Sequence, residues 1–251
     1  MSEIIEFFGG IGILTKNVWK ELFQRPMNIN LIIDQVFQIG YRSLPIVIVT
    51  AVSTGMVMTL QFGLGLERFG GTLYVPRIIT VSILREMGPV FSALMIAARV
   101  GAGIASEIGS MVVTQQIDAI RALGTSPIKK IVIPRLLACI ISVPLLIGIA
   151  NLVGFLGGLY VGVFELKLDP EFYILKAINN LQVGDYFSGF GKSFFFAIFI
   201  AVSSCYFGMT VKDGTKGVGL ATTKAVVFSS ILILVGDFFL TKLFWVFEKW
   251  A

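Results

Sequence analysis

Five ionisable side chains lie in or beside long apolar stretches of the sequence: Arg85, Glu86, Arg99, Lys192 and Asp237. A charge at membrane depth is costly, so such residues are functional candidates by default. They could form ion pairs, hold an anionic headgroup or relay protons. The 251 residues contain no histidine, which excludes Ser-His-Asp triads and histidine-ligated metals.

Three of these charges predict a salt bridge near one membrane surface. Arg85 and Glu86 precede the second apolar run, and Lys192 precedes the fourth, so the topology places all three at one depth, at the outer ends of their spans. We expect Glu86 and Lys192 to form a periplasmic salt bridge that holds the mouth of a cavity. Arg85 would then be available to a lipid phosphate. Ordinary snorkelling of boundary charges towards water is the alternative.

The other two of these charges, Arg99 and Asp237, are predicted to be intramembrane polar groups, together with Glu107. Asp237 lies near the middle of the fifth span, and Lys242 is off its helical face, so we expect a hydrogen bond from Asp237 to another span. Arg99 falls towards the inner leaflet. Glu107 is two helical turns further on, close enough to share a network with it.

The elements that position these residues are membrane helices. Hydrophobic residues make up 56% of the chain and charged residues 14%, about half the charged share of a soluble domain. The predicted fold class is an all-α integral membrane protein with five transmembrane helices, each near the ~20 residues that cross a bilayer. The transmembrane permease domain takes residues 43–251, with spans at about 43–66, 87–106, 136–164, 193–211 and 225–247.

Residues 1–42 are predicted to form N-terminal interfacial and elbow helices. They are not expected to be a signal peptide, because Glu3 and Glu6 stand where a basic segment would be. An interfacial helix, broken at Pro26, is indicated by apolar residues at helical spacing. These residues are Ile4, Phe7, Ile11, Leu14, Val18 and Leu22. A frayed N-terminal extension is the alternative.

The basic residues predict the orientation. With a cytoplasmic N-terminus and a periplasmic C-terminus, eleven Lys and Arg residues fall in cytoplasmic segments and seven in outer segments. No basic run is interleaved with aromatic residues, so nucleic acid is not expected as a partner despite the net charge of +5. Cys139 and Cys205 lie in apolar runs and are expected to be buried packing residues rather than metal ligands.

The segment between the second and third spans predicts a cytoplasmic coupling helix. Apolar residues from Val112 to Leu123 recur at helical spacing, and Gly124 with Pro127 would end the helix. Such a helix suits a groove on a partner protein. The residues expected to couple to an ATPase are Gln115, Gln116, Asp118, Arg121, Leu123 and Gly124. An interfacial or re-entrant helix without a partner is the alternative.

A lipid-binding cavity is expected at the outer end of the first span. Glycines 63, 65, 70 and 71 predict irregular backbone there, which a membrane protein tolerates only beside protein or a cavity. The candidate acyl-chain lining is Leu60, Phe62, Leu64, Leu66, Phe69 and Tyr74, joined by Arg85 at the lipid phosphate. A patch that simply faces lipid is the alternative.

Small residues also recur every fourth position and predict helix-packing faces. One face is Gly154, Gly158 and Gly162, and the other is Gly101, Ala105 and Gly109. These faces would pack within the chain or form the seam of a homodimer. The sequence Gly191-Lys192-Ser193 resembles the end of a phosphate-binding loop, but Tyr186 replaces its first glycine, so the chain is not expected to hydrolyse nucleotide.

Three separated motifs resemble one known family. The run AARVGAGIASEIGSM with TQQIDAIRALGTSP, the run LREMGPV at 84–90 and the C-terminal GVGLATTKAVVFSSILILVGDFFLT are similar to the MlaE/YrbE permeases. These are membrane subunits of ABC lipid transporters that work with MCE proteins. The resemblance covers about residues 40–245. One departure is a glutamine, Gln115 or Gln116, where the family usually has a glutamate, which removes one expected ion pair with the ATPase.

The resemblance implies a non-enzymatic transport subunit of the bacterial inner membrane. Two copies would bind two cytoplasmic ATPase subunits, which hold ATP and Mg, so no cofactor belongs to this chain. An oligomeric MCE-domain protein would sit on the periplasmic face, and a small cytoplasmic STAS-type subunit is a further candidate. Phospholipid or a similar lipid would be the cargo, in the service of outer-membrane lipid asymmetry.

Three other readings compete with this one. An ion-gradient-driven secondary transporter would use Asp237, Arg99 and Glu86 as a relay and would need no ATPase. A lipid-modifying enzyme would need converging catalytic groups, for which only Arg85, Glu86 and Lys192 qualify. A structural scaffold would leave the buried charges unexplained.

Overall fold

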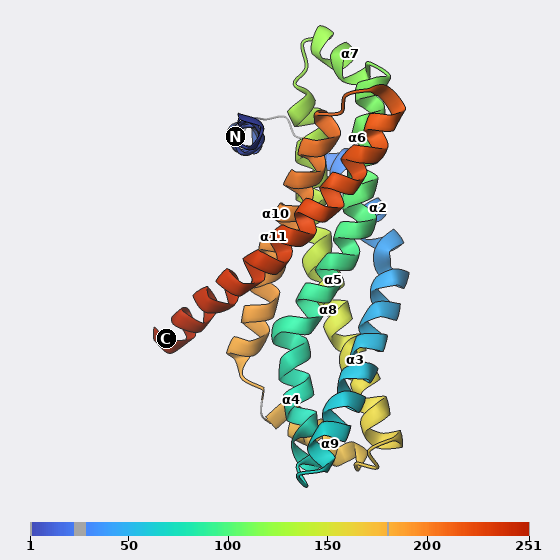
Figure 1. Ribbon diagram of the computed structural model, residues 1–251, viewed down its shortest axis with the longest axis vertical. Coiled ribbons are helices and arrows are strands. Elements are labelled where there is room, and N and C mark those ends of the chain that lie inside the picture. Colours follow the sequence, from blue (N-terminus) through green and yellow to red (C-terminus); the bar gives the residue numbers. More distant parts are fainter. Residues whose placement is uncertain (1, 23–28, 180, 251) are drawn as a thin grey trace. The chain divides into compact units, whose positions relative to one another are not determined.

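The computed structural model describes residues 2–22, 29–179 and 181–250, and side chains within 9–22, 29–179 and 181–247. Every regular element in these ranges is helical (Figure 1). Five helical stretches are long and apolar enough to cross a membrane, which confirms the predicted fold class. They are Ile29–Glu67, Thr72–Val113, Ile128–Phe164, Val183–Met209 and Gly214–Phe247.

These stretches are built from shorter elements that follow one another along the chain. The α-helices before the third stretch are α1 (Ser2–Leu22), α2 (Ile29–Ile39), α3 (Leu44–Glu67), α4 (Val75–Ser82), α5 (Gly88–Ile96), α6 (Ala102–Val113) and α7 (Gln116–Ala122). The later ones are α8 (Ile133–Phe164), α9 (Pro170–Asn179), α10 (Val183–Met209) and α11 (Gly214–Trp250).

The chain forms two compact units, and the long helices contribute residues to both. The first, the α7 unit, comprises Met1–Ser43, Ile96–Val143 and Phe195–Ile233. The second, the α9 unit, comprises Leu44–Met95, Pro144–Phe194 and Leu234–Ala251. Each unit is described below by itself.

The helices extend beyond the charge-free runs of the sequence. The second stretch continues through η3 (Ile83–Met87) and η4 (Ala97–Gly101), two π-helical turns within otherwise α-helical structure. Arg85 and Glu86 therefore lie inside this stretch rather than at its end. Lys192 lies well inside α10, which begins at Val183. A span predicted from a charge-free run is too short when the helix contains charged residues that have partners. π-Helical turns often mark functional sites, and both of these carry ionisable residues.

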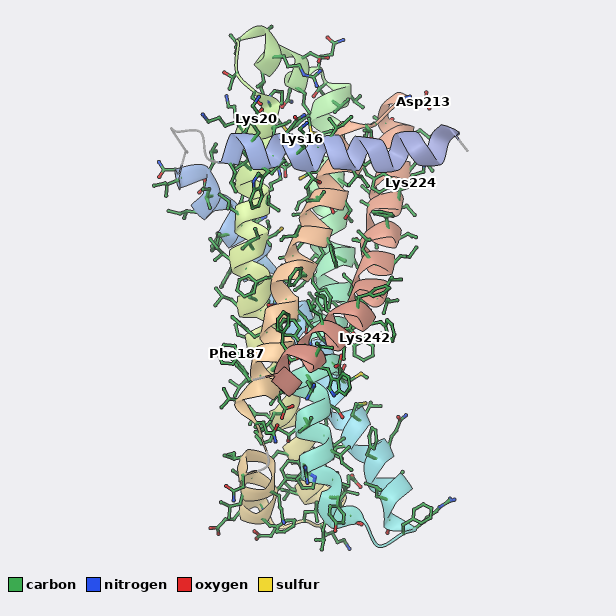
Figure 2. All side chains as sticks on the ribbon, turned by 90° about the vertical axis from the view of Figure 1, so that its left-hand side faces the viewer. Lys16, Lys20, Phe187, Asp213, Lys224 and Lys242 are labelled. Carbon is green, nitrogen blue, oxygen red and sulfur yellow. The ribbon has the colours of Figure 1, made fainter. Side chains whose placement is uncertain are left out.

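Helix α1 packs against other helices of the α7 unit through its apolar face. Leu14 and Val18 are buried, whereas Lys16 and Lys20 are exposed. Gly10 lies against the ring of Tyr206 on α10. Figure 2 shows α1 lying across the helices of its unit, with both lysines labelled. This arrangement is the expected N-terminal helix; the break expected at Pro26 lies outside the described residues, as do the side chains of Ile4 and Phe7.

Glycines allow close helix packing in the α9 unit. A Cβ on Gly55 of α3 would overlap the backbone of Gly154 on α8. Gly158 and Gly162 of α8 lie against the ring and hydroxyl of Tyr173 on α9. Burial raises the pKa of Tyr173 to about 12, so the phenol is neutral at physiological pH. The glycine face of α8 thus packs within the chain, one of the two arrangements expected for it.

The second small-residue face also packs within the chain, in the α7 unit. Gly101 lies against Ser204, and Gly109 lies against Val211 and Val218. The irregular backbone expected at glycines 63 and 65 is absent, because α3 continues through both to Glu67. Of the four glycines named there, only Gly70 has a positive φ, of 67°.

Candidate functional site

A cluster of charges surrounds Lys192 in the α9 unit. The Lys192 side chain is fully buried, and its Nζ lies 2.5 Å from Glu86 Oε2 and 3.0 Å from Asp237 Oδ1. It also donates hydrogen bonds to Thr241 Oγ1 at 2.6 Å and to the carbonyl oxygen of Arg85 at 3.3 Å. The structure therefore brings together the two residues expected to pair, Glu86 and Lys192, and adds Asp237 as a second carboxylate.

Three elements supply the Lys192 cluster, and glycines let them approach. Glu86 comes from η3 and Lys192 from α10, while Asp237 and Thr241 are one turn apart on α11. Gly189 lies on α10, three residues before Lys192. A Cβ on Gly189 would overlap the carbonyl oxygen of Leu84. A Cβ on Gly191 would lie 2.5 Å from the Phe244 ring of α11. Small residues on α10 thus set its distance to both neighbours.

The Lys192 cluster contains more acid than base. When all three groups are ionised, one ammonium faces the two carboxylates of Glu86 and Asp237, which gives a net charge of −1. Thr241 hydrogen-bonds to both oxygens of Glu86, at 3.3 Å each. A buried charge needs such partners, because removal from water is otherwise unfavourable. The arrangement joins three helices through one side chain and can accept a proton or a cationic group.

Arg85 is engaged by a different acid. Its Nη1 lies 2.9 Å from Asp185 Oδ1 at the start of α10. The other oxygen of Asp185 accepts a hydrogen bond from the backbone N–H of Gln182, at 3.1 Å. Arg85 thus has an anionic partner that the sequence analysis did not name, and its role at a lipid phosphate stays a prediction. The pairing escaped the sequence analysis because α10 begins at Val183, ten residues before the predicted span, and so includes Asp185.

Another ion pair, between a buried arginine and an exposed glutamate, lies in the α7 unit. Arg135 Nη2 of α8 lies 2.8 Å from Glu107 Oε1 of α6, and Arg135 Nη1 donates to the carbonyl oxygen of Ile131 at 3.0 Å. Arg135 is only 6% exposed at its side chain. This pair joins the two ends of the segment that contains α7. Glu107 therefore pairs with Arg135 rather than with Arg99, although Arg99 and Glu107 line one cavity.

The predicted coupling segment is two helices rather than one. Gln115 has a left-handed backbone, with φ of 58°, and separates α6 from the seven-residue α7. Gly124 has φ of 72° and follows the end of α7. Uniform helical spacing from Val112 to Leu123 cannot reveal such a break, because the turn changes the direction of the chain without changing its apolar pattern.

Helix α7 exposes the side chains expected to meet a partner. Ile117 is its buried residue, whereas Leu123 is 79% exposed. Arg121 Nη1 lies 3.1 Å from Asp118 Oδ1 on the helix surface. The other residues predicted to couple to an ATPase, Gln115, Gln116 and Gly124, are exposed as well. After α7, Ser126 Oγ donates a hydrogen bond to Glu21 Oε2 of α1, at 2.6 Å.

The predicted acyl-chain lining is largely on the surface of the α9 unit. Exposed side chains are Leu60, Phe62, Leu64, Phe69 and Tyr74. Leu66 differs, because it packs against the buried cluster of Val75, Ile79 and Ile83. Its place there follows from the bend after α3, where the N–H groups of Phe69 and Gly71 both hydrogen-bond to the Leu66 carbonyl oxygen.

Comparison with known proteins gives one consistent result. The family model for Permease MlaE matches residues 32–243. A probable ABC transporter permease protein of Rickettsia felis is 43% identical over 223 residues, which cover 89% of this chain and 86% of that protein. A second, from Synechocystis, is 37% identical over 230 residues, 92% of this chain and 88% of that protein.

A third relative has a more specific name. The intermembrane phospholipid transport system permease protein MlaE of Haemophilus influenzae is 30% identical over 246 residues. The match covers 96% of this chain and 94% of that protein. The matched region therefore spans the parts of the chain that contain the Lys192 cluster, the Glu107–Arg135 pair and α7.

Proposed function

The chain belongs to the MlaE permease family, and on that premise we propose that it is the membrane subunit of an ABC transporter that moves phospholipid between the inner membrane and a periplasmic MCE-domain partner. The name of the Haemophilus relative, a permease of an intermembrane phospholipid transport system, supports phospholipid as the cargo. A similar amphiphile would fit the exposed apolar residues of the α9 unit that are predicted to line the acyl chains.

The observation that carries this proposal is the exposed helix α7. Leu123 is exposed just after its last residue, beside the exposed Asp118–Arg121 pair, so this surface is available to a groove on a partner protein. The sequence has no phosphate-binding loop, so a separate ATPase would supply the energy. We infer that α7 docks on that ATPase, with Gln116, Asp118 and Arg121 at the rim of the contact.

The contacts of α7 suggest how ATP hydrolysis would reach the membrane helices. The Glu107–Arg135 pair joins the helices that enter and leave the α7 segment. The Ser126–Glu21 hydrogen bond joins the same segment to α1. A displacement of α7 by the ATPase would therefore be transmitted to α6, α8 and α1 together.

The assembly proposed for this chain follows the family. Two copies would form the core, with one ATPase subunit under each α7 and ATP and Mg bound by the ATPase. An oligomeric MCE-domain protein would bind the periplasmic side, and a small cytoplasmic STAS-type subunit would bind the ATPase. The chain would lie in the inner membrane with a cytoplasmic N-terminus and a periplasmic C-terminus, as the basic residues indicate.

The test is a pull-down from mild detergent. Wild-type chain should co-purify with an ATPase and phospholipid, whereas Leu123→Glu should lose the ATPase and retain the lipid. The double change Asp118→Lys with Arg121→Glu reverses the exposed charges of α7 while keeping a pair within the helix. It should also lose the ATPase.

Leu123→Met is the matched control and should retain the ATPase, because it keeps an apolar side chain at this position. The proposal fails if the wild-type chain transports lipid in vesicles under an ion gradient with no ATPase present. That outcome would favour the secondary transporter, for which the excess of carboxylates around Lys192 is the supporting observation.

A further inference from the structure

A cavity of about 240 Å³ opens in the α7 unit between α2, the turn Tyr41–Ser43 and the segment formed by η4 and α6. Its polar lining is Gln35, Gln38, Arg42, Arg99 and Glu107. The volume equals about eight water molecules at ~30 Å³ each. It is large enough for a phosphate group with part of the glycerol attached to it.

The ionised side chains of the cavity lining, two arginines and one glutamate, carry a net positive charge. The glutamate, Glu107, lies 2.8 Å from Arg135, which is outside the lining. In the part of the chain that the structure describes, no ion pair engages Arg42 or Arg99. Two guanidinium groups and two side-chain amides thus line one space. A guanidinium presents parallel N–H donors that match the oxygens of a phosphate.

The depth of the cavity matches a lipid headgroup. Gly101, two residues after Arg99, lies against Ser204 of α10. Tyr206, two residues further along α10, is the residue against which Gly10 of α1 packs. Helix α1 is amphipathic, with exposed lysines, as expected of a helix at a membrane surface. Arg99 therefore lies within about two turns of the level of α1, where headgroup phosphates would be found.

Local structure also favours a site at Arg99. It belongs to the π-helical turn η4, which displaces a side chain from the position that a regular α-helix would give it. Such turns are frequent at functional sites. An arginine inside a membrane-spanning stretch is costly unless it meets an anion or water. The cavity gives Arg99 access to both.

We propose that this cavity binds a phosphate anion, held by Arg42 and Arg99, with the amides of Gln35 and Gln38 as further donors. The two sources of such an anion are the headgroup of a lipid, such as phosphatidylglycerol, and free phosphate. This phosphate site shares no residue with the Lys192 cluster. Its occupancy needs no ATPase, so its failure would leave the proposed function intact.

The experiment measures binding of phosphatidylglycerol with a fluorophore on one acyl chain to the full chain in mild detergent. Changing both arginines, Arg42→Gln with Arg99→Gln, should weaken binding at least about tenfold, because two charged hydrogen-bond donors are lost. The control, Lys16→Gln with Lys20→Gln, removes the same charge from α1 in the same unit. It should change affinity less than about twofold.

Two further arms identify the ligand. Diacylglycerol with the same fluorophore should bind the wild-type chain and the arginine variant equally. If millimolar inorganic phosphate displaces the labelled lipid, the site belongs to free phosphate; if it does not, the site belongs to the lipid headgroup. Equal loss of affinity in the arginine and lysine variants would overturn the proposal.

A change in oligomeric state without a change in lipid affinity would also overturn it, since the arginines would then pair with a second copy. Arg42→Gln alone, at an exposed position before α3, guards against misfolding of the double variant. Its affinity should fall between those of the wild-type chain and the double variant.

Discussion

Lys192 is fully buried between the carboxylates of Glu86 and Asp237. The ionised form of each of these three residues is therefore stabilised by the opposite charge beside it. The pairing of Glu86 with Lys192 could be predicted from topology, because both charges border apolar runs on one side. A bond between Asp237 and another span is predicted as well, but not that Lys192 is its partner. The predicted spans put Lys192 at the end of one and Asp237 in the middle of another, whereas the early start of α10 places Lys192 well inside its helix.

Removing the ammonium group alone should destabilise the protein. Lys192→Met leaves two carboxylates facing each other, and breaking a buried pair in this way costs about 3 kcal/mol, less here because Glu86 and Asp237 are partly exposed. We expect a clear fall in the melting temperature in detergent.

The triple change Lys192→Met, Glu86→Gln and Asp237→Asn should restore much of that stability, because no unpaired charge remains. Lipid transport should stay impaired in the triple variant if the charges act in transport. Recovery of full transport would show that the Lys192 cluster is only structural.

Close backbone contact at Gly189 makes a second residue-scale prediction. Gly189→Ala places a methyl group on the carbonyl oxygen of Leu84, so η3 and α10 must separate. We expect loss of stability of about 1–3 kcal/mol and weaker transport, since Glu86 and Lys192 lie on these two elements. The control is Gly65→Ala in α3, where no atom lies within 4 Å. A melting curve for Gly189→Ala as high as that of Gly65→Ala would contradict this account of the packing.

At the scale of elements, charged residues inside the helices explain why the helices extend beyond the predicted spans. The apolar runs predicted the number and order of the spans, but not the 42-residue length of the second stretch. Its π-helical turns and the break at Gln115 leave no distinct signal in hydropathy. The Glu107–Arg135 pair is not predicted for a related reason: Arg135 lies just outside the predicted third span, although it is buried against α6.

The Glu107–Arg135 pair should hold the α7 segment in place. Glu107→Gln should speed amide hydrogen exchange in residues 114–128 by several-fold and weaken ATPase binding, with α10 unaffected. The exchange Glu107→Arg with Arg135→Glu should recover part of the protection, because opposite charges meet again. Unchanged exchange in Glu107→Gln would mean that backbone packing alone orders the segment.

At the scale of the whole molecule, five crossings, one for each helical stretch long and apolar enough to span a membrane, would put the two termini on opposite sides. The chain is well suited to a direct test of topology, because Cys139 and Cys205 are both fully buried. A membrane-impermeant thiol reagent should leave the wild-type chain unlabelled.

Single exposed cysteines should then report the two sides. Lys176→Cys on α9 should be labelled from the periplasm in cells whose inner membrane is intact, whereas Leu123→Cys after α7 should need a permeabilised inner membrane. The reverse pattern would overturn the proposed orientation, and labelling of both sites from one side would overturn the number of crossings.

The π-helical turns have a consequence for how this sequence tolerates insertions and deletions. A residue adds about 100° of rotation to an α-helix, and a π-helical turn holds one residue more than an α-helical turn for about the same rotation. Deleting one residue from η3 would therefore restore regular α-helical winding with little rotation of Gly88–Met95 relative to α4. Gly88 would keep its contact with the side chain of Asn151. A deletion elsewhere in the stretch would rotate the residues that follow it by about 100°, so these five-residue turns are where the helix best tolerates the loss of a residue.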